Sequence, residues 1–186
     1  MITYGKTNVA PLGVIWIAVS ANGLHSVKIG GTEADFVRSL TPGDHEAAFD
    51  NDSISIVADQ LQEYLSGDRN QFELEIDWGQ LTEFQESALR RTYEIPLGEV
   101  MTYGQVAESL GRSAGAARAV GRAMATNPIP IIIPCHRVVG AKGELTGYGG
   151  AGGLETKAWL LTFEGQQVIG NFVMSQQPSA QMRMPW

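Results

Sequence analysis

Hydrophobic residues in the first half of the chain follow a strand pattern and then a helical one. Residues 13–20 (GVIWIAVS) and 24–29 (LHSVKI) are short runs rich in Val and Ile, joined by Ala21-Asn22-Gly23. Two such runs around an Asn-Gly turn predict a β-hairpin. A helix is predicted over residues 33–40. Residues 54–65 carry apolar side chains at helical spacing and end at a Ser-Gly-Asp stop signal, which predicts a second helix.

The pattern changes again before residue 80, where we place a domain boundary. Residues 71–77 alternate between apolar and polar side chains, which predicts a strand. Thr82 and Gln85 then have the spacing of a capping box, in which two side chains satisfy free amides at a helix start. A helix is therefore predicted from this point to about Tyr93.

A second capping box introduces a pair of short helices. Thr102 and Gln105 repeat the spacing ahead of a helix that ends near Leu110. Gly111-Arg112-Ser113 interrupts the chain, and Ser113 is expected to cap a second helix that continues to about Ala125. A short helix, a glycine-containing turn and another helix form a helix-turn-helix, although many protein cores also contain such a pair.

Together these elements predict the fold class and the domains. Residues 1–80 should form an α/β domain, a small antiparallel sheet with helices. Residues 81–170 should form a mainly α domain with a winged-helix-like helix-turn-helix. Residues 171–186 are rich in Gln, Ser, Pro and Met and are predicted to be a flexible tail.

Composition narrows the class of protein. The chain has 186 residues, of which 44% are hydrophobic, values typical of a soluble globular protein. No apolar run approaches the roughly 20 residues of a membrane span, and no basic segment precedes an apolar signal region at the N-terminus. A single cysteine suits a reducing compartment, so we expect a cytoplasmic protein with no membrane partner. Three scattered histidines and one cysteine predict no metal site.

Charge is unevenly distributed along the chain. The net charge is −7, yet residues 1–84 hold 4 Lys or Arg against 13 Asp or Glu. Between Glu108 and Glu144 there is no acidic residue, while five basic residues lie there: Arg112, Arg118, Arg122, Arg137 and Lys142. A local basic surface on an acidic protein is typical of phosphate-backbone binding, and chance clustering on a solvated face is the alternative.

The second helix of the pair has two different faces. At 100° per residue one side collects Ala116, Ala117, Val120 and Met124. The opposite side collects only small and basic residues, namely Ala114, Gly115, Arg118, Gly121, Arg122 and Ala125. Such a face could approach a nucleic-acid groove closely, with Arg118 reaching farthest. Close packing against a neighbouring helix is the other interpretation.

The only cysteine lies in a distinctive context. Cys135 follows an apolar run and Pro134, and it precedes His136 and Arg137. A lone thiol beside an imidazole suits a thiolate nucleophile, and the adjacent His and Arg are expected to help keep it ionised. A buried structural cysteine is the alternative. The glycine-rich residues 147–153 lack the Lys-Ser/Thr of a P-loop, so nucleotide binding is not predicted.

Four motifs in order extend this interpretation. They are YGQVA at 103–107, RAVG at 118–121, Asn127-Pro128, and PCHRV at 134–138. The set resembles the O6-alkylguanine-DNA alkyltransferases, closely over residues 84–170 and loosely over the N-terminal part. This resemblance implies DNA repair by direct, irreversible transfer of an alkyl group from O6-alkylguanine, or O4-alkylthymine, in double-stranded DNA to Cys135. It implies a single turnover with base flipping, no cofactor and a monomer that can assemble cooperatively on DNA.

The resemblance also implies residue roles. His136 would act through a water as the base for Cys135, Glu164 would hold the imidazole tautomer, and Tyr103 would donate to the departing guanine and help rotate its phosphate. Arg118 would fill the gap left by the flipped base, and Asn127 would orient the turn before the cysteine. The implied DNA-binding residues are Arg118, Tyr103, Ala114, Ala117, Gly121, Arg122 and Arg137. The implied substrate pocket comprises Pro130, Tyr148, Gly149 and Gly150.

The sequence departs from the family pattern at two places, and two alternative functions stay open. The glycine loop is about two residues longer than the family pattern, and Arg122 stands where relatives carry a small residue, which leaves the preferred alkyl size open. A non-catalytic alkylated-DNA-binding module of the alkyltransferase-like type would lack the cysteine that this chain has. A cysteine hydrolase unrelated to DNA would need neither Arg118 nor the acid-free stretch.

Overall fold

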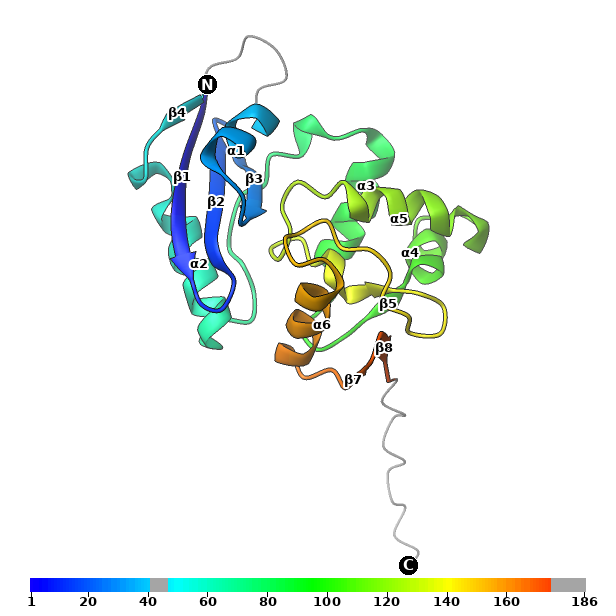
Figure 1. The fold of residues 1–186 in the computed structure, drawn as a ribbon. Helices are drawn as coiled ribbons and strands as arrows, with labels where there is room; N and C mark the ends of the chain where they lie inside the picture. The colour runs from blue at the N-terminus through cyan, green and yellow to red at the C-terminus, as the bar shows by residue number, and fades with distance from the viewer. Residues whose placement is uncertain (41–46, 175–186) are drawn as a thin grey trace, which may run out of the picture.

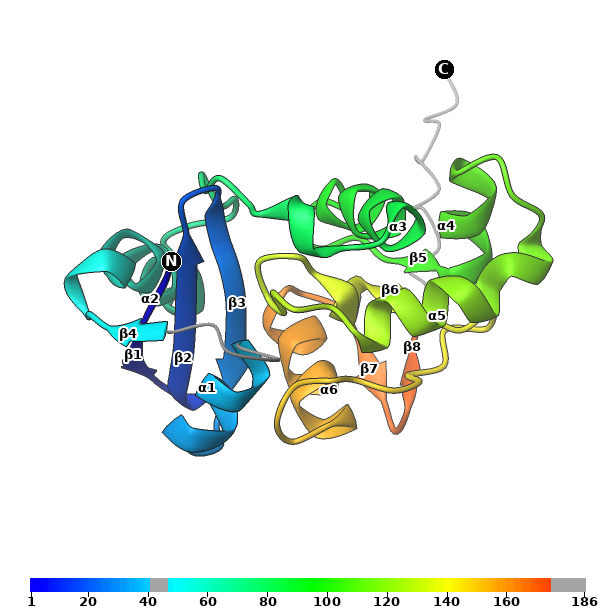
Figure 2. The same ribbon diagram turned by 90° about the horizontal axis from the view of Figure 1, so that it is seen from above.

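The computed structural model describes residues 1–40 and 47–174, which form two domains side by side (Figures 1 and 2). The N-terminal domain contains strands β1 (Ile2–Val9), β2 (Gly13–Ser20), β3 (Gly23–Ile29) and β4 (Ala47–Phe49), and helices α1 (Glu33–Leu40) and α2 (Ser55–Ser66). The short 3-10 helix η1 (Asp52–Ile54) precedes α2, and a second one, η2 (Trp78–Gln80), lies in the segment between the two domains.

The C-terminal domain is mainly helical. Its helices are α3 (Glu83–Tyr93), α4 (Tyr103–Ser109), α5 (Ala117–Ala125) and α6 (Leu154–Phe163), with 3-10 helices η3 (Ala114–Ala116) and η4 (Cys135–Arg137). Its strands are the parallel pair β5 (Met101–Thr102) and β6 (Val138–Val139), and the hairpin β7 (Val168–Ile169) and β8 (Phe172–Val173). In the described part of the chain, no helix combines the length and apolar composition that a bilayer crossing requires.

The N-terminal sheet is covered on both faces, which explains the unbroken apolar run in β2. Its strand order is β3-β2-β1-β4. Ile15 and Ile17 face α2 and join the main core, whereas Trp16 and Ala18 face α1 and pack with its Phe36. Because successive side chains of a strand point to opposite faces, burying both faces requires apolar residues at successive positions.

One apolar core crosses the domain boundary. It includes Ile15 and Leu61 from the N-terminal domain and Leu89, Val106 and Ile133 from the C-terminal domain, all fully buried. Edge strand β3 also bonds directly to the other domain, because the Val27 amide donates to the Pro128 carbonyl at 2.8 Å. The two domains are therefore fixed to each other by continuous packing.

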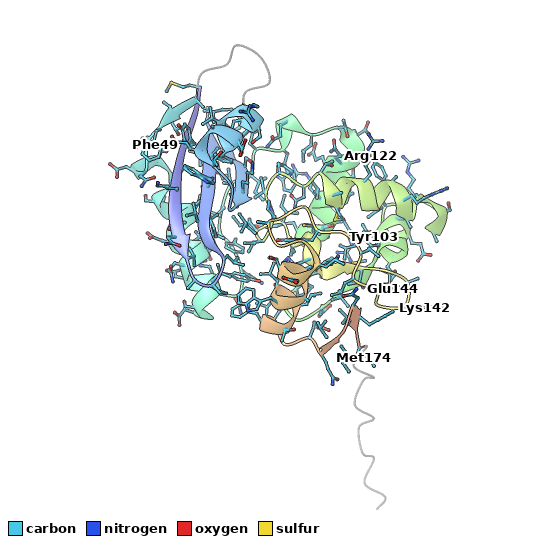
Figure 3. All side chains as sticks on the ribbon, viewed as in Figure 1. Phe49, Tyr103, Arg122, Lys142, Glu144 and Met174 are labelled. Carbon is cyan, nitrogen blue, oxygen red and sulfur yellow. The ribbon has the colours of Figure 1, made fainter. Side chains whose placement is uncertain are left out.

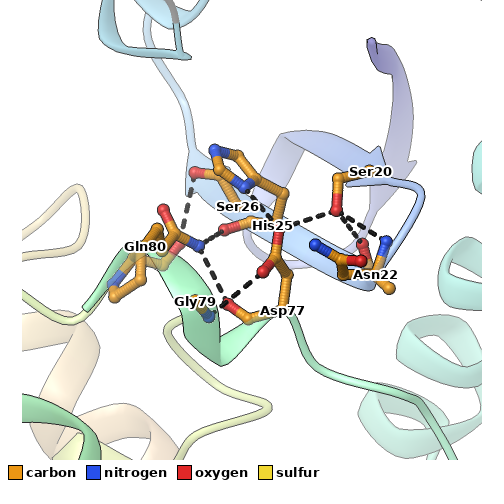
Figure 4. Close-up of polar contacts among 9 residues, drawn as sticks. Ser20, Asn22, His25, Ser26, Asp77, Gly79 and Gln80 are labelled. Atoms are coloured by element: carbon orange, nitrogen blue, oxygen red, sulfur yellow. Dashed lines mark hydrogen bonds and ion pairs between the residues drawn. The ribbon is translucent and has the colours of Figure 1, made fainter. Parts of the chain in front are cut away.

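The interdomain segment is anchored by a polar cluster around Asp77 (Figure 4). Its carboxylate accepts from Ser20 Oγ at 2.6 Å and lies 3.2 Å from His25 Nδ1. The Gly79 amide donates to the same side chain at 3.2 Å, and Gln80 Nε2 donates to the His25 carbonyl at 2.5 Å. These bonds hold the start of the connection to α3 against β3.

Several sequence predictions match the structure. The hairpin β2–β3, helix α1 and helix α2 lie where the pattern placed them. Both capping boxes are present, with Thr82 and Gln85 at α3 and Thr102 and Gln105 at α4. Strands β1 and β4 were not predicted, and β4 pairs with β1 in parallel, so the sheet is mixed rather than antiparallel.

Three local predictions were wrong. Residues 71–77 form an extended segment with one isolated bridge, Ile76 to Leu24, because the Gln60 side chain bonds both backbone groups of Glu73. Ser113 makes no side-chain cap bond, and a turn of 3-10 helix precedes α5. Residues 171–174 belong to the β7–β8 turn and hairpin instead of a flexible tail, and residues 175–186 lie outside the described residues.

Candidate active site

Cys135 begins η4, immediately after a tightly folded segment. Asn127 clasps this segment: its Nδ2 donates to the Ile133 carbonyl at 2.9 Å and its Oδ1 accepts from the Ile129 amide at 3.0 Å. Ile131 between them has a φ of 74°, a conformation that costs a β-branched residue energy. Asn127 is therefore placed to fix the turn before the cysteine, in keeping with the role implied by the resemblance.

The Cys135 thiol is buried, with 5% of the residue exposed. Burial raises its pKa, while the Asn127 side chain and the positive charge of Lys157 act in the opposite direction. The expectation that the adjacent His and Arg keep the thiol ionised was wrong for the resting protein. The two neighbours are directed to Glu164, and the dry surroundings disfavour the thiolate.

His136 and Glu164 form a fully buried pair. His136 Nε2 lies 2.6 Å from Glu164 Oε1, and neither side chain is exposed. Burial lowers the pKa of His136 despite this carboxylate, so the imidazole is neutral. Its Nε2 then carries the proton donated to Glu164, which leaves Nδ1 as an acceptor. Nδ1 is buried and bonds no group in the described residues.

Glu164 stays ionised at the C-terminal end of α6. Burial alone raises its pKa, but the hydrogen bonds from His136 and Arg137 and the charge of the Arg137 guanidinium outweigh burial and hold the pKa well below its usual range. Arg137 donates to both carboxylate oxygens, from Nε at 2.8 Å and Nη2 at 3.0 Å. The ion pair supplies the positive charge that a buried carboxylate needs.

The prediction that Arg137 binds DNA was wrong. The residue is 6% exposed, and its remaining donor Nη1 bonds the Ile95 carbonyl at 2.5 Å. A guanidinium engaged on three acceptors inside the protein is unable to reach a phosphate. The other four basic residues of the acid-free stretch, Arg112, Arg118, Arg122 and Lys142, are exposed.

Two site residues were missed by the sequence analysis. Tyr64 on α2 donates its hydroxyl hydrogen bond to Glu164, and Lys157 on α6 is fully buried. Lys157 Nζ donates to the Val138 carbonyl at 2.7 Å and the Thr146 carbonyl at 3.1 Å, and burial lowers its pKa to about 8. The helical spacing of Lys157 with Leu160 and Leu161 was a signal for this burial, whereas Tyr64 looked like an ordinary core residue.

The helix-turn-helix presents the predicted outer face of α5. Val120 and Met124 are buried as expected, and Ala123 joins them, while Arg118 and Arg122 are exposed. A cavity of about 390 Å³ lies beside this face and is lined by Tyr103, Ala117, Arg118, Gly121, Met124, Ala125, Thr146 and Gly147. Figure 3 places Tyr103, Arg122 and Lys142 together on this domain. Four predicted DNA-contact residues thus share one cavity.

Tyr103 links this cavity to the thiol region. It is the first residue of α4, and its hydroxyl donates to the Thr146 carbonyl at 3.3 Å and accepts from Thr146 Oγ1 at 3.1 Å. Burial raises its pKa, so the phenol is a proton donor. The Lys157 ammonium lies 5.9 Å from its ring centroid.

The predicted substrate-pocket residues divide between two places. Pro130, Gly149 and Gly150 line a separate interdomain cavity of about 540 Å³ together with residues of β3. Tyr148 points into the interior, where its hydroxyl is buried without a partner in the described residues, and burial and the nearby Cys135 raise its pKa. Tyr148 is thus near enough to Cys135 for the two side chains to interact electrostatically.

Comparison with known proteins agrees with this architecture. Residues 2–78 match the family model described as 6-O-methylguanine DNA methyltransferase, ribonuclease-like domain, and residues 83–166 match the DNA binding domain of the same name. The chain is 44% identical to the methylated-DNA–protein-cysteine methyltransferase of Mycobacterium leprae over 125 residues, which are 67% of this chain and 73% of that protein. The corresponding Shigella flexneri protein is 48% identical over 113 residues, 61% of this chain and 64% of that protein.

A solved structure extends the likeness to nearly the whole described fold. The crystal structure of Mycobacterium tuberculosis OGT in complex with DNA matches with a TM-score of 0.74 and 36% identity, covering 88% of this chain and 93% of that one. A DNA-binding domain that buries a nucleophile, an imidazole and a carboxylate beside its helix-turn-helix defines a DNA repair protein that reacts through a cysteine. The chain belongs to the 6-O-methylguanine DNA methyltransferase family, the methylated-DNA–protein-cysteine methyltransferases.

Proposed function

We propose that this protein takes the alkyl group from O6-alkylguanine in double-stranded DNA onto Sγ of Cys135, once per molecule. The observation that carries the proposal is the buried His136–Glu164 pair, 2.6 Å apart, whose histidine directly follows the only cysteine of the chain. The imidazole has a free acceptor nitrogen, and an ionised carboxylate on its other side supports the positive charge that a proton would bring.

The chemistry is a displacement at an sp³ carbon. The Cys135 proton passes to His136 Nδ1, through a bridging water as the family resemblance implies. The thiolate then forms the S–C bond to the alkyl carbon while the C–O6 bond breaks, and the electron pair remains on guanine. Because the resting thiol and imidazole are both neutral, the thiolate forms next to the substrate, where it is consumed.

Tyr103 serves the leaving group in this proposal. Guanine departs with an extra electron pair, and a phenol whose pKa is raised by burial can donate a hydrogen bond or proton to it. Tyr103 lines the same cavity as Arg118, so one cavity brings together the expected donor and the expected space-filling residue. The small residues Ala117 and Gly121 leave room there for DNA.

Intact mass measurement tests the reaction. The protein is mixed with duplex DNA containing one O6-methylguanine, and we expect the protein mass to rise by one methyl group in place of a hydrogen. Peptide mapping should place the group on Cys135, and Cys135→Ser should remain unmodified. Unmodified wild-type protein that still binds the duplex would support the non-catalytic DNA-binding alternative instead.

A matched pair of arginine variants tests base flipping. Arg118 and Arg122 are both exposed on α5, but only Arg118 lines the cavity with Tyr103. Arg118→Ala is expected to slow repair of duplex DNA by about ten-fold or more while leaving the reaction with free O6-benzylguanine unchanged. Arg122→Ala should weaken DNA binding with a salt slope lower by about 1 and leave saturated repair unchanged. Equal losses of Arg118→Ala on both substrates would rule out the flipping role.

A further inference from the structure

Tyr64 of the N-terminal domain contacts the reactive centre of the C-terminal domain. Tyr64 lies in the last turn of α2, 1% exposed, and its hydroxyl donates to Oε1 of Glu164 in the other domain. The same oxygen receives His136 Nε2. Tyr64 therefore bonds to the same carboxylate oxygen that accepts the hydrogen bond of the His136 imidazole.

From this geometry we propose that Tyr64 is a positioning residue for alkyl transfer, so that the N-terminal domain completes the Cys135 site of the C-terminal domain. The inference rests on the proposed function, in which Glu164 orients His136. It assigns a chemical task to a domain that contributes no nucleophile, base or recognition helix.

The carboxylate of Glu164 accepts hydrogen bonds from four donor atoms, which belong to Tyr64, His136 and Arg137. Arg137 grips it through two nitrogens, both from the same guanidinium plane. Tyr64 and His136 both bond to Oε1, the oxygen that also accepts from Arg137 Nη2. Because Tyr64 belongs to the other domain, its hydrogen bond adds a restraint on the carboxylate that the ion pair and the imidazole of the C-terminal domain do not supply.

Packing holds the Tyr64 ring independently of its hydroxyl. The ring centroid lies 5.0 Å from that of Phe72 and 5.8 Å from that of Phe163, the residue immediately before Glu164. The ring thus packs between its own domain and the end of α6. Replacement by phenylalanine preserves these ring contacts and removes only the hydroxyl, with its hydrogen bond to Glu164 and its interaction with Arg137, which makes the test selective.

The chain offers a matched control in Tyr93. Its hydroxyl donates to the Phe72 carbonyl at 3.0 Å and also joins the two domains, but it does not contact Glu164. Tyr93→Phe removes the same chemical group from the same interdomain region. It measures how much reactivity a lost interdomain hydrogen bond costs through structure alone.

The experiment uses the full chain and free O6-benzylguanine, which reacts without DNA. For Tyr64→Phe we expect the maximal inactivation rate constant to fall about ten-fold, with the half-saturating concentration unchanged, because one hydrogen bond to a charged group is lost. Tyr93→Phe should retain the wild-type rate. Circular dichroism and thermal unfolding of both variants accompany the kinetics.

The pH profile provides a second readout that a purely structural role would leave unchanged. Glu164 interacts with Tyr64, Tyr148, His136 and Arg137, and His136 also feels the charges of Arg137 and Lys157. Without the tyrosine donor, the carboxylate favours protonated His136 more strongly, so the acid limb of the rate profile should move to higher pH. Tyr93→Phe should leave the limb in place.

The outcomes separate this inference from the proposed function. If wild-type protein does not become alkylated, the proposed function fails and the role of Tyr64 falls with it. If wild type reacts and Tyr64→Phe matches it in rate and pH profile, only the inference is overturned. Equal slowing of both variants, or outright unfolding of Tyr64→Phe, would make Tyr64 a structural residue and overturn the inference too.

Discussion

Two histidine–carboxylate pairs occur within residues 1–40 and 47–174, and they differ in spacing, burial and hydrogen-bond partners. His25 and Asp77 lie 3.2 Å apart at the domain connection, with side chains 15% and 9% exposed. His136 and Glu164 lie 2.6 Å apart, with neither side chain exposed. The first pair is bonded to neutral donors from Ser20 and Gly79, whereas the second is bonded to a guanidinium and a phenol.

The difference shows what converts a structural pair into a reactive one. Asp77 has a lowered pKa, because the Ser20, His25 and Gly79 hydrogen bonds outweigh the effect of burial, and it ties a connecting segment to a strand. Glu164 has its charge fixed by Arg137, and the imidazole beside it retains an unused nitrogen next to a cysteine. Burial, a buried counter-charge and an adjacent thiol make the second pair suitable for catalysis.

Matched amide substitutions should separate the two pairs most widely. Glu164→Gln leaves the buried Arg137 guanidinium without its anion, so we expect a stability loss of about 3–5 kcal/mol and alkyl transfer slowed more than about 100-fold. Asp77→Asn should cost about 1 kcal/mol and leave the rate constant unchanged. Urea unfolding and O6-benzylguanine kinetics measure both quantities. Comparable stability losses in the two variants would contradict the distinction.

Acid should act on the Glu164 pair in two stages. The pKa of Glu164 is depressed below its usual value of 4.5, so its ionised form contributes stability that is fully present above pH ~5 and is lost as the pH falls below about 4.5. The lowered pKa of His136 means that the unfolded chain binds more protons below pH ~6.5, so stability also falls below that pH.

Urea unfolding at a series of pH values measures this dependence. Glu164→Gln should flatten the decline below pH ~4.5, and His136→Gln should flatten the part between pH ~6.5 and ~4.5. Asp77→Asn should remove a smaller share of the acid dependence, since the Asp77 pKa is lowered in the same direction. An unchanged curve in Glu164→Gln would mean that other carboxylates control acid unfolding.

The two histidines should differ in rate rather than in stability. His136→Gln removes the proposed base, and we expect a transfer rate at least about 100-fold lower at pH 7. His25→Gln keeps a polar side chain near Asp77 and should react at the wild-type rate. Stopped-flow or quenched single-turnover assays with O6-benzylguanine distinguish the variants. A slow His25→Gln protein would indicate that the domain connection affects the reactive centre.

Ser20→Ala tests the smallest expected effect. The substitution removes the 2.6 Å bond from Ser20 Oγ to Asp77, and we expect a stability loss of about 1 kcal/mol without any change in alkyl transfer. Thermal unfolding with Ser26→Ala as the control is sufficient, since Ser26 Oγ donates to the Pro128 carbonyl at 3.2 Å instead. A change in transfer rate would show that the Asp77 cluster has more than a structural role.

Local sequence signals predicted the elements that depend on local bonds. The capping boxes at Thr82 and Thr102 and the hairpin turn after Ser20 were correct because side-chain and backbone groups a few residues apart satisfy one another. Strand β1 was missed because its apolar positions are interrupted by Gly5, Lys6 and Asn8. Its extended form depends on pairing with β2 and β4.

The active site was predictable only where sequence neighbours or family motifs carried it. Cys135 and His136 are adjacent, and Glu164 came from the resemblance. Arg137 was misassigned because a basic residue in an acid-free stretch is expected to lie on the surface. Its actual partner, Glu164, lies 27 positions away in the sequence. The contact from Tyr64 spans 100 positions and depends on how two domains pack, which no local pattern records.

The left-handed backbone at Ile131 has a consequence for the order in which the molecule opens. A non-glycine residue at φ 74° stores about 1–3 kcal/mol, held in place by the Asn127 clasp and the surrounding core. Hydrogen exchange should therefore be faster for amides of residues 129–133 than for neighbouring amides of α3 that are equally buried. Ile131→Gly would relieve this strain but would also remove a fully buried side chain, at a cost of about 2–5 kcal/mol, so exchange in the segment that carries the thiol should become faster still.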